Sequence, residues 1–264
     1  MARVKTVTDF LENIAPLELQ EDYDNSGLIT GSSEWKVKGV ICSLDCTPDV
    51  VQEAIDQDCN LIVCHHPIIF EGLKKLSGDS YIERAVVSAI RHDVAIYAIH
   101  TNLDNVMQHG VNQKIAERLG LENCSILAPK NEVGNTGAGL IGHFAEPMKV
   151  GEFFDFIKTK FELEVFRYTH SPAIQKVQKV VVCGGSGSFL LENAVAAGTD
   201  VFITADFKYH QFFDADNRVL VLDIGHYESE KFTIQLLHEL IFNNFRNFAA
   251  QMTKVNTNPV RYFR

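Results

Sequence analysis

The stretch 40-VICSLDCTPDVVQEAIDQDCNLIVCHHPI-68 predicts a complete strand–helix–strand unit. Residues 37–45 form an apolar run typical of a strand, and residues 48–57 predict a helix with proline in its first turn. Residues 61–64 then predict a second strand, which ends in two adjacent histidines. Units of this kind place a helix over a parallel pair of strands, so the stretch favours an α/β fold.

The alternation of helix and strand continues beyond this unit. Residues 81–93 predict a helix, residues 94–100 a strand, and residues 111–120 a helix closed by glycine. Such βα alternation predicts a mostly parallel sheet with helices on both faces.

An internal repeat extends the prediction to the second half of the chain. Residues 40–68 align without gaps on 180-VVVCGGSGSFLLENAVAAGTDVFITADFK-208, and residues 94–104 resemble residues 219–230 with one inserted residue. We therefore expect two similar α/β lobes that face each other across a cleft. Their predicted ranges are 1–125 and 126–264, packed closely and without a flexible linker.

The remaining segments have weaker signals. Residues 6–16 and 150–161 predict helices, and residues 138–144 and 163–170 predict strands. The glycine-rich residues 131–140 predict a turn, and the apolar spacing of residues 231–250 predicts a helix in the core or at a subunit contact.

Composition excludes several classes of protein. The 264 residues are 46% hydrophobic and carry a net charge of −10, which argues against a nucleic-acid-binding face. The six cysteines include no C-x-x-C pair, so we expect reduced thiols and a cytoplasmic location. The sequence contains neither a signal-peptide pattern nor an apolar run long enough to cross a membrane.

Histidines and acids follow the predicted strands at equivalent places. His65 and His66 end one strand, and the segments 100-HTNLD-104 and 226-HYESE-230 each pair a histidine with an acid four residues later. That spacing places both side chains on one face of a helical turn. Imidazole and carboxylate ligands suit zinc, iron or manganese, and two ions bridged by a carboxylate can share a water molecule. The predicted set is His65, His66, His100, Asp104, His226 and Glu230, with Asp104 and Glu230 as bridging carboxylates and His100 as a residue that orients Asp104.

Other polar segments leave alternatives open. The loop 184-GGSGS-188, and within it Gly184, Gly185, Ser186 and Gly187, would either bind a phosphate or form a tight strand–helix turn. Asp45 is a helix cap or a site residue, and residues 22–28 line the cleft or form a solvated loop.

Five motifs together resemble the GTP cyclohydrolase I type 2 homologue family, also called Nif-three-like. They are HHPIIF, HTNLDN, VVVCGGSGS, DIGHYESE and 255-VNTNPVRYF-263. The resemblance implies a dinuclear metal centre, with ligands at His65, His66, Asp104, His226 and Glu230, in a ring-like homohexamer. Residues 121–140 are too few for the inserted domain of some members, and residues 204–210 depart from the Gly-Glu expected there.

The same resemblance implies an activity. The protein would be a metal-dependent hydrolase that opens the purine ring of GTP and releases formate. Two alternatives stay open, namely another metal-dependent nucleotide hydrolase or phosphoesterase, and a hexameric metal-binding scaffold with little catalysis.

Overall fold

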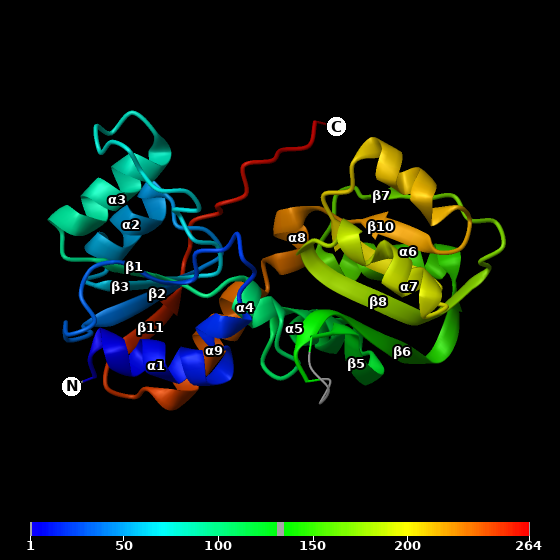
Figure 1. Ribbon diagram of the computed structural model, residues 1–264, viewed down its shortest axis with the longest axis horizontal. Coiled ribbons are helices and arrows are strands. Elements are labelled where there is room, and N and C mark those ends of the chain that lie inside the picture. Colours follow the sequence, from blue (N-terminus) through cyan, green and yellow to red (C-terminus); the bar gives the residue numbers. More distant parts are fainter. Residues whose placement is uncertain (1, 131–134, 264) are drawn as a thin grey trace. The chain divides into compact units, whose positions relative to one another are not determined.

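A computed structural model describes residues 2–130 and 135–263 of the chain, which form two sheets with helices (Figure 1). The predicted α/β class is confirmed. Part of the glycine-rich turn predicted at residues 131–140 lies outside the described residues. In the described part of the chain, no helix is both long and apolar enough to cross a membrane.

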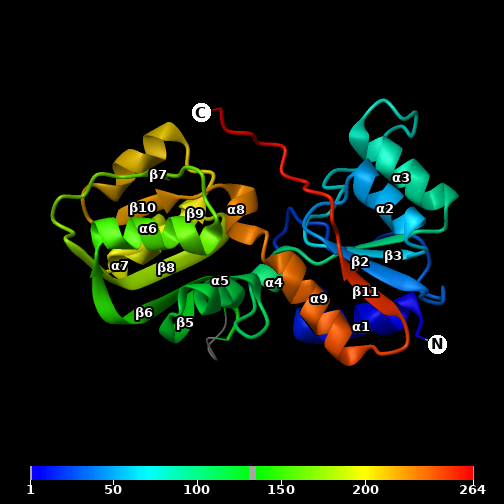
Figure 2. The same cartoon turned by 180° about the vertical axis from the view of Figure 1, so that it is seen from behind.

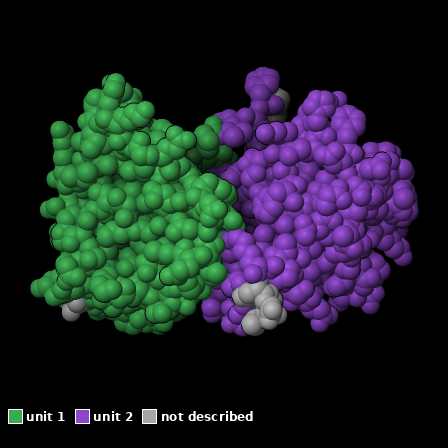
Figure 3. All heavy atoms as spheres, in the orientation of Figure 1, with its two compact units in different colours: residues 1–103, 233–259 green, residues 104–232, 260–264 purple. Residues whose placement is uncertain are grey.

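The chain divides into two compact units, coloured green and purple in Figure 3. Unit 1 comprises Met1–Leu103 and Thr233–Pro259, and unit 2 comprises Asp104–Phe232 and Val260–Arg264. This division differs from the predicted boundary between residues 125 and 126. Strand β11 (Ala249–Met252) pairs in parallel with β2 (Gly39–Ser43), so the segment Thr233–Pro259 belongs to unit 1.

The sheet of unit 1 is mostly parallel, as predicted. Its strand order is β1-β4-β3-β2-β11, and only β1 (Gly27–Thr30) runs antiparallel to its neighbour. Strands β3 (Leu61–Cys64) and β4 (Ala95–Ala98) are buried along their whole length. Continuous burial requires cover on both faces, and the helices supply it.

Four helices cover this sheet (Figures 1 and 2). Helices α2 (Pro48–Asp56) and α3 (Tyr81–Arg91) lie on one face, where their apolar side chains join Ile41, Ile62 and Ile96 in one core. Helices α1 (Val4–Ile14) and α9 (Thr233–Asn244) lie on the other face. The helix predicted over residues 231–250 therefore ends at Asn244, and strand β11 follows it.

The sheet of unit 2 is mixed, unlike the mostly parallel sheet predicted. Its order is β5-β6-β8-β9-β10-β7, in which only β8, β9 and β10 run parallel to one another. The strand bounds are β5 Glu122–Pro129, β6 Gly137–Lys149, β7 Arg167–Tyr168, β8 Lys176–Ser186, β9 Val201–Ala205 and β10 Leu220–Asp223. The antiparallel pairs are β5 with β6, β6 with β8, and β10 with the two-residue edge strand β7.

The helices of unit 2 are short apart from two. Helices α5 (Val111–Leu119) and α6 (Val150–Phe161) pack on β6 and β8. The 3-10 helices η2 (Ser188–Leu190) and η3 (Tyr209–Ala215) and helix α7 (Leu191–Ala196) contribute to the core over the side chains of Val181 and Phe202. Helix α8 (His226–Glu230) follows β10 directly.

The predicted repeat appears as a shared three-strand core. Strands β2, β3 and β4 of unit 1 run parallel, as β8, β9 and β10 do in unit 2. In both units the third strand also pairs with an antiparallel edge strand. The corresponding strands therefore direct their carboxyl ends to one edge of each sheet, where the predicted site residues follow.

Candidate metal centre

Unit 1 brings three imidazoles together at the carboxyl edge of its sheet. His65 and His66 follow β3, and His100 follows β4, whose Ala98 is paired with Cys64 of β3. The ring centroids of His65 and His66 are 4.9 Å apart, and each is 5.2 Å from that of His100. One ring nitrogen of each residue lies within 4.8 Å of those of the others. The arrangement suits a divalent metal ion.

Each of these three rings is held through its Nδ1 atom. His65 Nδ1 lies 2.9 Å from the carbonyl oxygen of Ile99. His66 Nδ1 lies 2.8 Å from Asp45, and His100 Nδ1 lies 2.8 Å from Asp24. Carbonyl and carboxylate oxygens accept hydrogen bonds, so Nδ1 carries the proton and Nε2 is the nitrogen suited to a metal. His100 thus bonds Asp24, and its predicted role of orienting Asp104 stays a prediction.

The Asp24 carboxylate is buried and is held by several hydrogen bonds. Its side chain is inaccessible to solvent and also accepts hydrogen bonds from the backbone N–H of Thr101 at 3.0 Å and the hydroxyl of Ser26 at 3.0 Å. Burial by itself raises the pKa of Asp24, but the hydrogen bond and charge of His100 outweigh it and hold the pKa well below its usual range. The sequence left open whether residues 22–28 line the cleft or form a solvated loop. In the structure this segment supplies the carboxylate of Asp24, which fixes the imidazole of His100.

Asp45 supports His66 in the same way. The N-cap of α2 is Thr47, so Asp45 is not the cap. Its second carboxylate oxygen accepts the hydroxyl of Thr257 at 2.5 Å. A segment near the end of the chain therefore fixes a side chain that follows the first parallel strand, and the sequence offered no signal for this contact.

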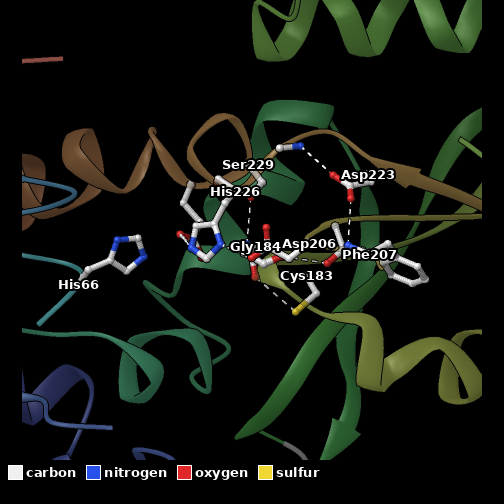
Figure 4. Close-up of polar contacts among 12 residues, drawn as sticks. His66, Cys183, Gly184, Asp206, Phe207, Asp223, His226 and Ser229 are labelled. Carbon is white, nitrogen blue, oxygen red and sulfur yellow. Dashed lines mark hydrogen bonds and ion pairs between the residues drawn. The ribbon is translucent and has the colours of Figure 1, made fainter. Parts of the chain in front are cut away.

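Unit 2 presents a histidine and a glutamate on one turn of α8. His226 Nε2 and Glu230 Oε2 are 3.1 Å apart, as the spacing of four residues predicts. Asp206 lies 2.7 Å from His226 Nδ1 (Figure 4). Burial lowers the pKa of His226, but the carboxylates of Glu230 and Asp206 outweigh it and raise the pKa to about 11. The motif that departs from the family pattern, 204–210, therefore contains the residue that orients His226.

Asp223 fixes the loop that carries Asp206. The Asp223 carboxylate is buried and accepts the backbone N–H groups of Phe207 at 3.0 Å and Gly225 at 3.2 Å. It also pairs with Arg167 on edge strand β7. These bonds hold the ends of β9 and β10 together, which places Asp206 beside α8.

The glycine loop packs against α8. A Cβ atom at Gly185, whose φ is +61°, would lie 2.4 Å from Glu230 Oε1. The N–H of Gly184 donates to Asn112 at 3.0 Å, and that of Gly185 donates to Ser229 at 3.0 Å. The phosphate-binding role of this loop stays a prediction, and these two N–H groups would have to leave their present partners to serve it.

Asp104 ends the short helix α4 (Thr101–Asp104) and belongs to unit 2. Burial raises the pKa of the Cys183 thiol, and the charges of Asp104 and Glu230 raise it further. One carboxylate oxygen of Asp104 lies within 4.8 Å of one of Glu230, which suits a cation held by both. The donors of each unit, imidazole in unit 1 and mainly carboxylate in unit 2, fit zinc, iron or manganese.

The remaining histidines for which contacts are described have ordinary roles. His92 Nδ1 bonds the carbonyl of Ser88 at 2.8 Å, and His238 Nε2 bonds that of Ala250 at 3.1 Å. The ring of His210 stacks on Phe213. None of these three belongs to a cluster of metal-binding groups among the described residues.

Comparisons with known proteins agree with the motifs. Residues 2–259 match the Duf34/NIF3 (NGG1p interacting factor 3) family. A Clostridium acetobutylicum protein named GTP cyclohydrolase 1 type 2 homolog is 35% identical, over 86% of this chain and 85% of its own length. A Campylobacter jejuni protein of the same name is 28% identical, over 99% of this chain and 100% of its own.

Solved structures share the fold. The crystal structure of Staphylococcus aureus protein SA1388 superposes with a TM-score of 0.90 at 29% identity and covers 99% of both chains. A Bacillus cereus protein related to NIF3 reaches 0.90 at 24% identity, again over 99% of both chains. On the family match across almost its whole length, the chain belongs to the Duf34/NIF3 family.

Proposed function

We propose that the protein is a hydrolase with a dinuclear metal centre, whose ligands are His65, His66, Asp104, His226 and Glu230. The observation that carries the proposal is shared by the three imidazoles of this set. Each has its Nδ1 bonded to a carboxylate or carbonyl oxygen, which leaves Nε2 for a metal. Histidines that bind metals are held in this way in most metalloproteins.

The residues of the proposed centre would have different roles. The imidazoles would bind the ions without adding charge, while Asp104 and Glu230 would serve as carboxylate ligands that offset part of the positive charge of two divalent ions. Asp45 and Asp206 keep the rings of His66 and His226 in one orientation. When bound, such ions would lower the pKa of a water molecule to about 7 and would supply positive charge to the oxygen that gains charge in the reaction.

The substrate part of the proposal rests on relatives. Proteins that are similar along most of the chain are named GTP cyclohydrolase 1 type 2 homolog. We therefore propose GTP as substrate, with opening of the purine ring and release of formate, in a cytoplasmic homohexamer. Light scattering of the purified protein tests the hexamer.

Metal analysis and turnover together test the function. The purified protein should contain two divalent ions per chain and should release formate from GTP. Release of phosphate instead would identify a phosphoesterase, and bound metal without turnover of any nucleotide would identify a scaffold.

Glu230→Gln removes one carboxylate charge and should abolish binding of at least one ion. Glu122→Gln, on the exposed edge strand of the same unit, is the matched control. An unchanged metal content in Glu230→Gln would refute the dinuclear assignment.

A further inference from the structure

Phe70 is an exposed aromatic residue beside the imidazoles of unit 1. It is 48% exposed, and its ring centroid lies 5.7 Å from that of His100. His100 is in turn 5.2 Å from both His65 and His66, which are ligands of the proposed centre. We propose that Phe70 is the surface on which a flat base of the substrate stacks, so that the site selects substrates carrying an aromatic heterocycle. The inference names a substrate class for the proposed function, on whose metal centre it rests.

The backbone next to Phe70 is held by the fold. Ile69 packs against the core that α2 and α3 form with the sheet. The carbonyl oxygen of Ile69 accepts a hydrogen bond from Asn25 Nδ2 at 2.7 Å. Asn25 follows Asp24, which holds the ring of His100, so one segment positions both aromatic rings. Because the backbone is fixed at this point, binding there costs little ordering of the chain.

The Phe70 ring keeps a face free for stacking. The rings of Phe70 and His100 stand at 79° to each other, which is an edge-to-face contact. Such a contact covers at most one face of the phenyl ring, and nearly half of the residue reaches solvent. Every nucleobase has a π face that can stack on a free aromatic ring. For GTP the stacked group would be guanine, the ring system that the proposed reaction opens.

Phe70 also lies in a long loop. Residues 65–80, all of them described, connect β3 to α3 without a helix or strand. Loops longer than about 12–15 residues without secondary structure are uncommon in compact domains and are usually either functional or disordered. This loop is held at its far end as well, where the Glu83 carboxylate accepts the N–H groups of Ser77 at 2.9 Å and Gly78 at 2.8 Å. An ordered loop of this length next to the imidazoles favours a role in binding.

Nucleotide affinity of the metal-loaded full chain tests the inference. Ultrafiltration directly after mixing compares the binding of GTP with that of inorganic triphosphate, which has no base. Phe70→Ala should weaken GTP binding about 10–100-fold, whereas Phe70→Tyr keeps an aromatic face and should bind GTP like wild type. Metal content and binding of triphosphate should be the same in Phe70→Ala as in wild type. Phe213→Ala removes an exposed ring from unit 2 and is the matched control, with normal GTP binding.

A tryptophan at the same position reports stacking directly. The sequence contains a single tryptophan, Trp35, so Phe70→Trp adds one indole at the proposed position. GTP should quench the emission that this variant adds over wild type, whereas inorganic triphosphate should not. Emission unchanged by saturating GTP, or equal GTP affinity in Phe70→Ala and wild type, would overturn the inference.

The outcomes separate this inference from the proposed activity. GTP binding through Phe70 without release of formate would refute the activity and leave the stacking site standing. Release of formate with an unchanged KM in Phe70→Ala would refute the stacking site and leave the activity standing. Wild-type protein that binds GTP no better than inorganic triphosphate would also overturn the inference.

Discussion

The two units place different donor groups at the ends of equivalent sets of three parallel strands. Unit 1 ends its strands with imidazoles and places carboxylates behind them, whereas unit 2 places a carboxylate and one imidazole on α8. In the gap-free alignment of the repeat, His66 corresponds to Asp206 and Asp45 corresponds to Gly185. A candidate ligand in one unit thus occupies the position of an orienting residue in the other.

The difference between a candidate ligand at residue 66 and an orienting residue at the equivalent residue 206 has a steric reason. In unit 1 the loop after β2 supplies Asp45, which holds the ring that follows β3. In unit 2 the equivalent loop position must be glycine, because the Glu230 carboxylate occupies the space of a side chain. The fold thus sets the positions of the donor groups. The residue in the loop, Asp45 or Gly185, determines whether the residue after the next strand is a candidate ligand or orients one.

The largest expected effect comes from Gly185→Ala. The new Cβ would lie 2.4 Å from Glu230 Oε1 at a φ of +61°, so both the carboxylate and the backbone must shift. We expect a loss of about 2–4 kcal/mol in the free energy of unfolding and loss of metal bound through unit 2. Urea unfolding and elemental analysis measure the two effects.

Gly198→Ala is the control for this variant. Its φ is +62°, but a Cβ atom there meets no atom within 4 Å. It should show only the backbone cost, about 1 kcal/mol. If both variants lost the same stability, the close approach of Gly185 to Glu230 would have no energetic role.

Asp206→Asn has the next largest effect and tests whether the residue equivalent to His66 is a support. Asparagine tolerates the φ of +59° at this position but cannot offer a charged acceptor to His226 Nδ1. Metal affinity should fall about 10–100-fold while the unfolding curve changes little. Asp216→Asn, at a φ of +43° in the same unit, removes the same charge and should bind metal normally.

The sequence predicted the core of the fold better than its edges. Strand 61–64 and helix 150–161 match β3 and α6 in full, since burial and spacing are local properties. Of the strand predicted at residues 163–170, only β7 (Arg167–Tyr168) forms. The helix predicted over residues 231–250 ends at Asn244, and its last predicted residues belong to β11. The partner of β11 is β2, about 200 residues earlier, and no local pattern encodes such pairing.

The same distinction between local and distant contacts applies to the site residues. Residue type and spacing identified His65, His66, His226 and Glu230 as candidate ligands, because metal chemistry selects few side chains. The supports Asp24, Asp206 and Thr257 were not assigned, since their roles depend on tertiary contacts. One usable signal was present, namely an acid within two residues of the end of a strand, as at residues 45 and 206.

Thr257→Val isolates the support of unit 1. Valine keeps the shape of the side chain but cannot donate to Asp45, which still accepts from His66. We expect a loss of about 1 kcal/mol in stability and weaker binding of zinc, used as the probe metal, through His66. Thr159→Val removes a hydroxyl that donates to a backbone carbonyl on α6 and should leave zinc binding unchanged. Equal zinc affinity in both variants would exclude Thr257 from the site.

The smallest effect concerns a surface restraint on α8. Lys231, directly after the helix, pairs with Glu162 at 2.7 Å. The hydrogen bond and charge of Lys231 lower the pKa of Glu162, against a small opposing effect of burial. A lowered folded pKa contributes stability above the unfolded value of about 4.3, and this contribution is lost as the pH falls through the folded pKa.

Because the Glu162 side chain is 65% exposed, solvent screens the pair and the effect on stability should stay well below 1 kcal/mol. Glu162→Gln should therefore cost a little stability at pH 7 and none near pH 2. Urea titrations at the two values measure the difference, with Glu122→Gln as the control for a lost surface charge. A constant difference across this range would mean that Glu162 acts through packing, and the restraint on α8 would then owe nothing to charge.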